Sequence, residues 1–287
     1  MILLLIAFLF SLHQVCVRKG TLKANTLYGT FISIVTTTLL FISLSALFVT
    51  NLNLVKLKSF VEFAVIAGIL HFMLARALFY QCISRVGANV AATLATTRIF
   101  FSAFLGYVLL GESIDFKTTV MAVMVFLGVA VLTFKVVSDL YGIFLGVSTG
   151  FFTALASVYA KECMLTNFTT TWLEAIVGTA LGYFVSLLIF SVFLIFYKSS
   201  IGNSIDVNLK NYLPFVVGGF FVGFGHFLRY LALSSYSVCT VETFISIYPI
   251  FTYILSSMFL RRSEIFNLRF FFAAFLIIAG VEFYLAH

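Results

Sequence analysis

The stretch ARALFYQCISRVGANVAATLATTRIFFSAFLGYVLLGESI at residues 75–114 has a counterpart later in the chain, LRYLALSSYSVCTVETFISIYPIFTYILSSMFLRRSEI at residues 228–265. In each stretch an arginine near the end of one apolar segment precedes a short turn, and a second apolar segment then ends at a glutamate. The paired residues are Arg76 with Glu112, 36 residues apart, and Arg229 with Glu264, 35 residues apart. This pattern predicts two copies of one structural unit.

The composition restricts the class of protein. Of the 287 residues, 62% are hydrophobic and only 9% are charged. Soluble domains carry about 25% charged residues, so this chain could not cover a surface that faces water. We therefore expect an integral membrane protein. The net charge of +7 is spread along loops and helix ends without a dense basic run, which argues against nucleic acid as a partner.

Ten apolar segments approach the roughly 20 residues that a helix needs to cross the hydrocarbon core. They lie near residues 1–17, 27–49, 60–83, 87–110, 116–135, 139–160, 170–197, 212–233, 238–260 and 268–286. Five fall in residues 1–137 and five in residues 138–287. Because five is odd, the second half must enter the bilayer from the opposite side. We therefore expect an all-α fold of ten transmembrane helices, arranged as two inverted five-helix repeats within one transmembrane domain.

A weaker match links the outer helices of the two halves. AFLFSLHQVCVRKG at residues 7–20 aligns with GFFTALASVYAKEC at residues 150–163. This alignment places Arg18 on Lys161 and Gln14 on Ser157. It agrees with the stronger match between the middles of the halves.

The doubled unit carries a resemblance to a known family. Each half has an Ala-Leu step, the first half closes a helix on Leu-Gly-Glu, and the second half has a proline fifteen residues before its glutamate. These residues are Ala77-Leu78, Ala232-Leu233, Leu110-Gly111-Glu112, Pro249 and Glu264. Over essentially its whole length the chain resembles the EamA-type branch of the drug/metabolite transporter superfamily. It departs from the pattern at Thr97, where a proline is usual, and at Arg261-Arg262-Ser263, where a Leu-Gly pair is usual.

The resemblance implies alternating access around a central cavity, and it implies cytoplasmic termini. Members of the superfamily export amino acids or carry sugar phosphates, nucleotide sugars or drugs. With cytoplasmic termini, however, the non-cytoplasmic loops would hold ten Lys and Arg residues and the cytoplasmic loops four. The positive-inside rule favours the opposite orientation. The two signals disagree, so we leave the orientation open.

Arginines inside the spans are candidates for a site, because each costs about 2.5–3.5 kcal/mol near a helix centre on insertion scales. Arg98 lies about twelve residues into the fourth segment, on a face of small residues that includes Ala91 and Ala95. We expect it to point into the bundle, where it is either held by carbonyls or Glu242 or docks an anionic group; a lipid-facing arginine is the third alternative.

Arg76 and Arg229 lie nearer their helix ends and either snorkel to the interface or face the bundle. His226 lies three residues before Arg229 and shares its face. His71 lies five residues before Arg76 and is expected on a different face.

Glu242 begins a polar stripe that continues along one helix face through Ser246, Pro249, Tyr253 and Ser256 or Ser257. A polar stripe with a proline is typical of a cavity lining, and interhelical hydrogen bonding is the alternative. Glu242 could also bind a coupling proton. The predicted substrate-binding residues are Arg98, Glu242, Ser246, Tyr253, Arg229, His226 and Gln14.

Enzyme chemistry is not expected. The run Gly146-Val147-Ser148-Thr149-Gly150 matches the GxSxG pattern of hydrolases but lies inside an apolar helix, away from any strand-to-helix turn. Gly142, Gly146 and Gly150 recur every four residues, which is typical of a helix packing face. The chain has no HExxH, Walker A or dinucleotide-binding motif, and its four cysteines lack metal-ligand spacing. We therefore predict no catalytic residue, no metal site and no cofactor.

These observations predict a secondary active transporter that works by alternating access on a small polar metabolite, anionic or zwitterionic, such as an amino acid. The expected partners are that substrate, the lipid bilayer and, if Glu242 carries them, coupling protons. We expect a monomeric multi-pass protein of the cell membrane. The alternative is a lipid-facing translocator or a membrane scaffold without a soluble substrate. It predicts that Arg98 is fully engaged by protein groups.

Overall fold

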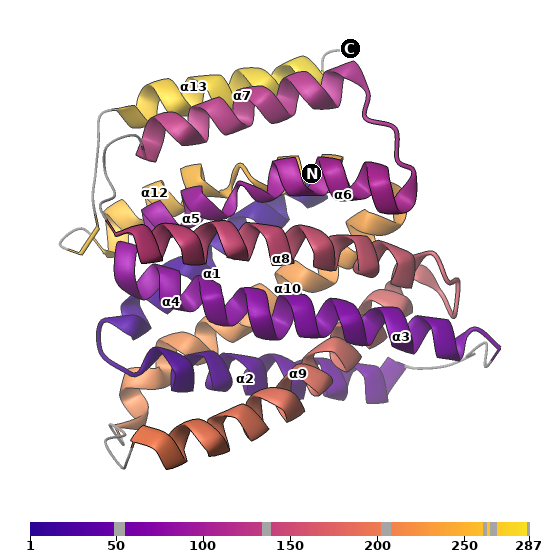
Figure 1. The fold of residues 1–287 in the computed structure, drawn as a ribbon, viewed down its shortest axis with the longest axis vertical. Coiled ribbons are helices and arrows are strands. Elements are labelled where there is room, and N and C mark those ends of the chain that lie inside the picture. Colours follow the sequence, from indigo (N-terminus) through magenta and orange to yellow (C-terminus); the bar gives the residue numbers. More distant parts are fainter. Residues whose placement is uncertain (49–54, 134–138, 202–207, 261–262, 265–268, 286–287) are drawn as a thin grey trace.

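The computed structural model describes residues 1–48, 55–133, 139–201, 208–260, 263–264 and 269–285. Within these residues the protein is all-helical (Figure 1). The helices are α1 (Ile2–Thr21), α2 (Thr26–Phe48), α3 (Leu57–Gly68), the π-helix η1 (Ile69–Ala75), α4 (Arg76–Val86), α5 (Ala88–Ala95), α6 (Arg98–Leu110), α7 (Phe116–Thr133), α8 (Leu140–Met164), α9 (Thr171–Ile201), the 3₁₀-helix η2 (Leu209–Tyr212), α10 (Leu213–Ser235), α11 (Val238–Ile245), α12 (Tyr248–Phe259) and α13 (Arg269–Leu285).

The helices follow the predicted segments closely. Eight helical runs in the described part are long and apolar enough to cross a membrane, judged by length and composition. The other two predicted segments correspond to α7 and α13, in which the apolar stretches found among the described residues are shorter, Phe116–Gly128 and Phe275–Tyr284. The total of ten spans and the inverted repeat therefore stay predictions. The predicted boundary between the halves, residues 137 and 138, lies outside the described residues.

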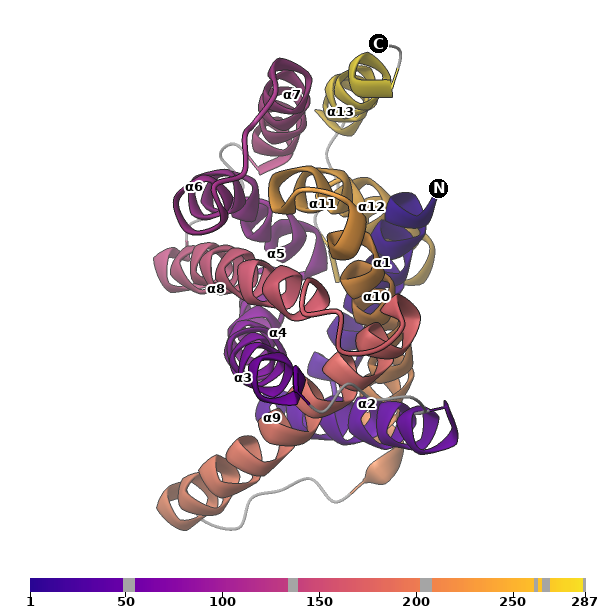
Figure 2. The same ribbon diagram turned by 90° about the vertical axis from the view of Figure 1, so that its right-hand side faces the viewer.

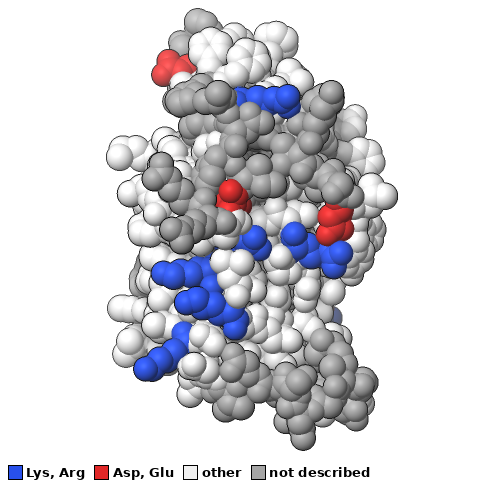
Figure 3. Space-filling view, turned by 90° about the vertical axis from the view of Figure 1, so that its left-hand side faces the viewer, with Lys and Arg blue, Asp and Glu red and all other residues white. Residues whose placement is uncertain are grey.

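The long helices run roughly side by side, so the bundle has two ends (Figure 1). Viewed from the side, α7 and α13 lie next to each other at one edge of the bundle (Figure 2). Lys and Arg side chains gather at the end where α4 finishes and α8 begins (Figure 3). Arg85, at the end of α4, is exposed and pairs with Asp139, directly before α8. Three basic residues of the loop-charge count, Lys135, Arg261 and Arg262, lie outside the described residues.

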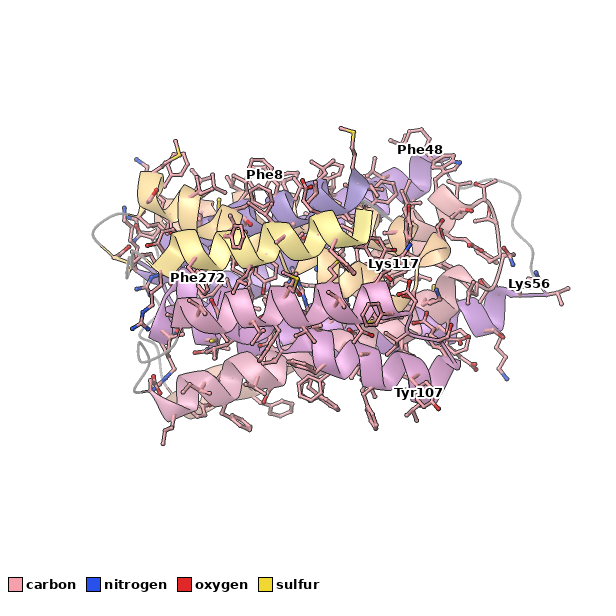
Figure 4. All side chains as sticks on the ribbon, turned by 90° about the horizontal axis from the view of Figure 1, so that it is seen from above. Phe8, Phe48, Lys56, Tyr107, Lys117 and Phe272 are labelled. Carbon is pink, nitrogen blue, oxygen red and sulfur yellow. The ribbon has the colours of Figure 1, made fainter. Side chains whose placement is uncertain are left out.

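The flanks of the bundle are apolar. Figure 4 shows Phe8, Phe48, Tyr107 and Phe272 directed outward from their helices, and Tyr107 is 66% exposed. In water such a surface would be unfavourable, since large contiguous apolar patches are rare on soluble monomers. In a bilayer the same side chains contact lipid tails, so this surface fits a membrane protein.

Glycines let the inner helices approach closely, as the four-residue spacing in α8 predicts. A Cβ at Gly150 would lie 2.9 Å from the backbone nitrogen of Arg98, and one at Gly142 would lie 2.5 Å from Val86 Cγ1. The Gly146 position is similarly crowded, with Leu94 Cδ1 at 3.0 Å. The packing interpretation of the GxSxG run is therefore confirmed. The glycine face of α8 packs against α4, α5 and the start of α6.

Candidate functional site

The third span contains a π-helix directly before Arg76. Residues Ile69–Ala75 form η1, between α3 and α4. A π-helix closes i→i+5 hydrogen bonds, so residues five apart come near the same face. Both His71 and Arg76 consequently line one cavity. The prediction that His71 lies on another face is wrong, because it assumed a regular α-helix through this segment.

The fourth and ninth spans are both broken near their middles. Helix α5 ends at Ala95 and α6 begins at Arg98, while α11 ends at Ile245 and α12 begins at Tyr248. At the first break, tight hydrogen bonds run from the N–H groups of residues 96 and 97 to carbonyls three residues earlier. The break frees the carbonyl of Ala92, which accepts a hydrogen bond from the Tyr248 hydroxyl at 2.9 Å. The two breaks therefore lie against each other.

A cavity with about 490 Å³ of empty space, counted to its open side, lies beside these breaks. Residues from both halves of the chain form its wall. The lining residues are Phe10, His13, Gln14, His71, Ala75, Arg76, Phe79, Tyr80, Ala95, Arg98, Thr149, Thr153, Val222, His226 and Tyr248.

Arg98 occupies the wall of this cavity at the first turn of α6. It is 5% exposed, and its guanidinium lies over the ring of Tyr248 with 4.8 Å from Cζ to the ring centroid. Its Nε atom donates to Ser246 Oγ at 3.1 Å and is 3.3 Å from Glu242 Oε2. Its Nη2 atom is buried without a hydrogen-bond partner. A positive charge at a helix N-terminus interacts unfavourably with the helix dipole. Residues that are locally unfavourable in this way are expected at functional sites.

Glu242 lies behind Arg98 and is fully buried. Its Oε1 atom is 2.6 Å from Arg229 Nη2 and accepts from Arg229 Nε at 2.8 Å and from Ser157 Oγ at 2.8 Å. Arg229, also fully buried, contacts His71 Nδ1 through Nη1 at 2.5 Å. One carboxylate is thus shared between two guanidinium groups.

Arg76 lies on another part of the wall and is 4% exposed. Its guanidinium is 4.7 Å from the ring centroid of Tyr183 and donates to the hydroxyl of that tyrosine. Its Nη1 atom is 3.4 Å from Ser33 Oγ, which also accepts from the Tyr80 hydroxyl at 2.8 Å. In the described part of the chain Arg76 has no carboxylate partner. Snorkelling to the interface is therefore wrong for Arg76, and burial excludes it for Arg229 as well.

The seven predicted site residues fall into three groups. Three of them line the cavity: Arg98, His226 and Gln14. Three lie behind the wall in contact with one another or with Arg98: Glu242, Ser246 and Arg229. Tyr253 is half-buried and does not line the cavity. Helix α11 ends at Ile245 and α12 begins at Tyr248, so the continuous helix that the predicted polar stripe assumed is interrupted before Tyr253.

Sequence reasoning missed several lining residues. His13 Nε2 is 2.8 Å from the Tyr80 hydroxyl, which joins α1 to α4 beside the cavity. The rings of His71 and His226 have centroids 4.3 Å apart. The chain has only four histidines, and three of them lie within the predicted spans. A titratable residue that is rare and lies within a span is the sequence feature that indicates these positions.

Two similar charge clusters hold the N-termini of α5 and α11, at opposite ends of the bundle. At one end Glu264 accepts from the backbone N–H groups of Ala88 at 2.9 Å and Asn89 at 3.0 Å, and it pairs with Arg18 at 2.9 Å. The second cluster also combines a glutamate, a basic residue and a helix N-terminus, with Glu112 and Lys161 at the positions that the sequence alignment pairs with Glu264 and Arg18. Glu112 accepts from the N–H of Val238 at 2.9 Å and pairs with Lys161 at 3.1 Å. Each glutamate thus caps a helix of the other half of the chain.

The apolar helices, the lipid-compatible flanks and the buried polar cavity define an integral multi-pass membrane protein. Residues 1–134, a little under half of the chain, match the model of the EamA-like transporter family. This match agrees with the predicted resemblance to the drug/metabolite transporter superfamily and indicates a membrane transporter of that type.

Among 29 matching chains of solved structures, one described as "Crystal structure of protein" superposes with a TM-score of 0.70. The match covers 98% of this chain and 96% of the other, at 14% sequence identity. At that identity the likeness shows a shared fold. No curated protein sequence matches the chain.

Proposed function

We propose that this protein is a secondary active transporter that moves a small anionic or zwitterionic metabolite by alternating access, on a scaffold of two inverted five-helix repeats. One observation carries the proposal. Arg98 lies on the wall of a cavity lined by both halves of the chain, and its buried Nη2 atom has no hydrogen-bond partner. An unpaired donor on a buried cation is unfavourable by about 1–3 kcal/mol or more. An anionic group in the cavity would satisfy it.

The position of Arg98 supports this role. Substrate sites of inverted-repeat transporters lie at the repeat interface, beside interrupted helices. Arg98 begins the second part of an interrupted helix, and Tyr248, which stacks on it, begins the second part of the other. The scaffold alternative needs Arg98 to be fully engaged by protein groups, which its unpartnered nitrogen does not favour.

The two capping clusters support alternating access. Each links the halves at one end of the bundle through a shared motif of glutamate, cation and helix N-terminus. In an alternating mechanism the cluster at the open end would separate while the cluster at the closed end stays formed. The repeat-equivalence of Arg18 with Lys161 and of Glu112 with Glu264 also supports the inverted repeat.

The coupling of transport to protons stays a prediction. Glu242 is already engaged by two guanidinium groups and Ser157. We propose that, if protons are coupled, Glu242→Gln abolishes gradient-driven uptake and leaves counterflow exchange intact.

Binding and transport by matched arginine variants test the role of Arg98. The wild type, Arg98→Gln and the control Arg85→Gln are purified and screened by thermal shift against amino acids and small carboxylates, then reconstituted for uptake of the probes that bind. Arg85 is a suitable control because it pairs with Asp139 at the surface, with a 45% exposed side chain. We expect Arg98→Gln to weaken binding at least about tenfold, with Arg85→Gln unchanged. Equal transport by the wild type and Arg98→Gln would refute the assignment.

Access to the cavity tests the two clusters. In a background with the native cysteines replaced by alanine, Thr149→Cys on the cavity wall is labelled with a membrane-impermeant maleimide from each side of oriented vesicles. Glu264→Gln should increase labelling from the end where α5 begins, and Glu112→Gln should increase it from the end where α11 begins. If Glu264→Gln and Glu112→Gln both increase labelling from the same side of the vesicles, these two contacts do not control alternating access.

A further inference from the structure

The charges around the cavity do not balance. Arg76 and Arg98 line it, while Arg229 and Glu242 lie directly behind it. Guanidinium groups stay protonated in proteins, so this cluster of described residues holds three positive charges and one negative charge, with the histidines counted as neutral. The excess is two positive charges. Unpaired charges in a low-dielectric interior are strongly unfavourable, and a ligand that neutralises both would bind best.

We infer that the substrate is a small dianion, carrying two carboxylates or one phosphate monoester. This inference rests on the proposed transport function and narrows its substrate class. Carboxylates and phosphates match the planar fork of a guanidinium, which can donate two parallel hydrogen bonds to them. Arg98 has a free donor for such a group, and the contacts of Arg76 are all to neutral side chains, Tyr183 and Ser33.

The same arrangement disfavours a zwitterion. An ammonium group needs an acceptor, best a carboxylate, and no carboxylate among the described residues lines the cavity. Glu242 is not among the lining residues: Oε1 is taken by Arg229 and Ser157, and Oε2, which accepts no hydrogen bond, lies 3.3 Å from Arg98 Nε. Placing an ammonium beside Arg76 and Arg98 would bring like charges together.

The remaining wall fits a small ligand with a short carbon chain. Gln14, Thr149 and Thr153 supply polar groups, while Phe10, Phe79 and Val222 supply apolar surface. Sites of this kind bury most of the ligand against apolar groups and orient it with a few polar ones. A carbon chain with an anionic group at each end can place those ends on two separate arginines, whereas a phosphate monoester would bring its charge to one of them.

Three ligands of one length and different charge test the inference. Succinate carries two negative charges, succinamate carries one, and 4-aminobutyrate is a zwitterion. Dissociation constants are measured at pH 7 by isothermal titration calorimetry on the purified full-length protein in detergent. Three further ligands are measured in the same way. Malonate and glutarate test dicarboxylates of other lengths, and glycerol 3-phosphate tests a phosphate monoester.

We expect at least one dianion to bind about tenfold or more tightly than its singly charged partner, since hydrogen bonds between charged groups are worth at least a factor of ten. Arg76→Gln should reduce that ratio to below about threefold, and Arg76→Lys, which keeps the charge, should restore most of it. Arg85→Gln should leave the ratio unchanged. The lysine variant and the thermal stability of each variant separate a loss of recognition from a loss of folding.

The outcomes distinguish this inference from the broader function. If 4-aminobutyrate or amino acids bind and the dianions do not, the dianion assignment is overturned and the transport of zwitterions stands. If neither dianions nor zwitterions bind, both are overturned. If glycerol 3-phosphate binds and the dicarboxylates do not, the ligand is a phosphate monoester. An undiminished succinate preference in Arg76→Gln would remove Arg76 from the site.

Discussion

Glu242 lies between two buried guanidinium groups, and replacing it with glutamine tests the charge balance of the site. The carboxylate is 2.6 Å from Arg229 Nη2 and 3.3 Å from Arg98 Nε, and it is fully buried. Glutamine has one acceptor oxygen and one donor NH2 group. If the oxygen accepts from Arg229, the NH2 group faces the donors of Arg98; if the oxygen faces Arg98, the contact with Arg229 is lost. Breaking a buried ion pair by removing one partner costs about 3–5 kcal/mol, so we expect Glu242→Gln to destabilise the protein by about that amount.

The free energy of unfolding can be measured by titrating dodecyl sulfate into mixed micelles and following helicity by circular dichroism. Glu62→Gln is the matched control, because Glu62 is 57% exposed and faces Lys58 at 3.9 Å on the surface of α3. Exposed pairs of this kind contribute about 0–1 kcal/mol. If Glu242→Gln destabilises the protein no more than Glu62→Gln does, the ion pairs of Glu242 with Arg229 and Arg98 do not stabilise the fold, and the reasoning is refuted.

A double-mutant cycle with Arg229→Gln isolates the pair. When both partners are neutral, no lone charge is left by the pair, so the double variant should be more stable than the sum of the single effects predicts. Contacting residues typically show coupling energies of about 0.5–3 kcal/mol, and this buried pair should lie in the upper part of that range. A coupling energy near zero would refute the pairing.

Three further predictions concern helix packing, pH and backbone conformation. Gly150→Ala should destabilise the protein by about 1–3 kcal/mol through overpacking, whereas Gly218→Ala, whose new Cβ would meet neighbours no closer than 3.4 Å, should be nearly neutral in the same unfolding assay. The backbone N–H of Gly142 holds the pKa of Asp139, outside the spans, below its usual value; the stability this provides is present above the unfolded pKa and is lost as pH falls through the lower folded pKa. The thermal-unfolding advantage of the wild type over Asp139→Asn should therefore shrink below about pH 4, and an advantage that grows on acidification would contradict the assignment. Gly87 has φ = 86° and ψ = 167°, a region nearly restricted to glycine, so Gly87→Ala should cost about 1–3 kcal/mol; an unchanged unfolding free energy would show that the chain can adopt another turn there.

Part of the site could be predicted from single residues. Arg98 stood out because a cation in the middle of an apolar segment must face protein or water, and Glu242 was recognised as its possible partner. The lining role of Arg76 and His71 could not be read from the sequence. Both depend on a π-helix, and a one-residue change in helical hydrogen bonding leaves no clear trace in an apolar pattern. Tyr253 is not among the cavity-lining residues, and its predicted face assumed an unbroken helix.

By itself the sequence determined the membrane class, the positions of the helical segments, the glycine packing face and the correspondence of Arg18 with Lys161 and Glu112 with Glu264. These properties are local, because hydrophobicity over about 20 residues decides whether a segment is stable in a bilayer. Only the tertiary structure decided that each glutamate caps a helix of the other half and that one carboxylate is shared by two arginines. The capping contacts and the Arg98–Glu242 pair join residues more than a hundred positions apart, whereas Arg229 and Glu242 are 13 positions apart but on different helices. In each case the packing of whole helices selects the partner.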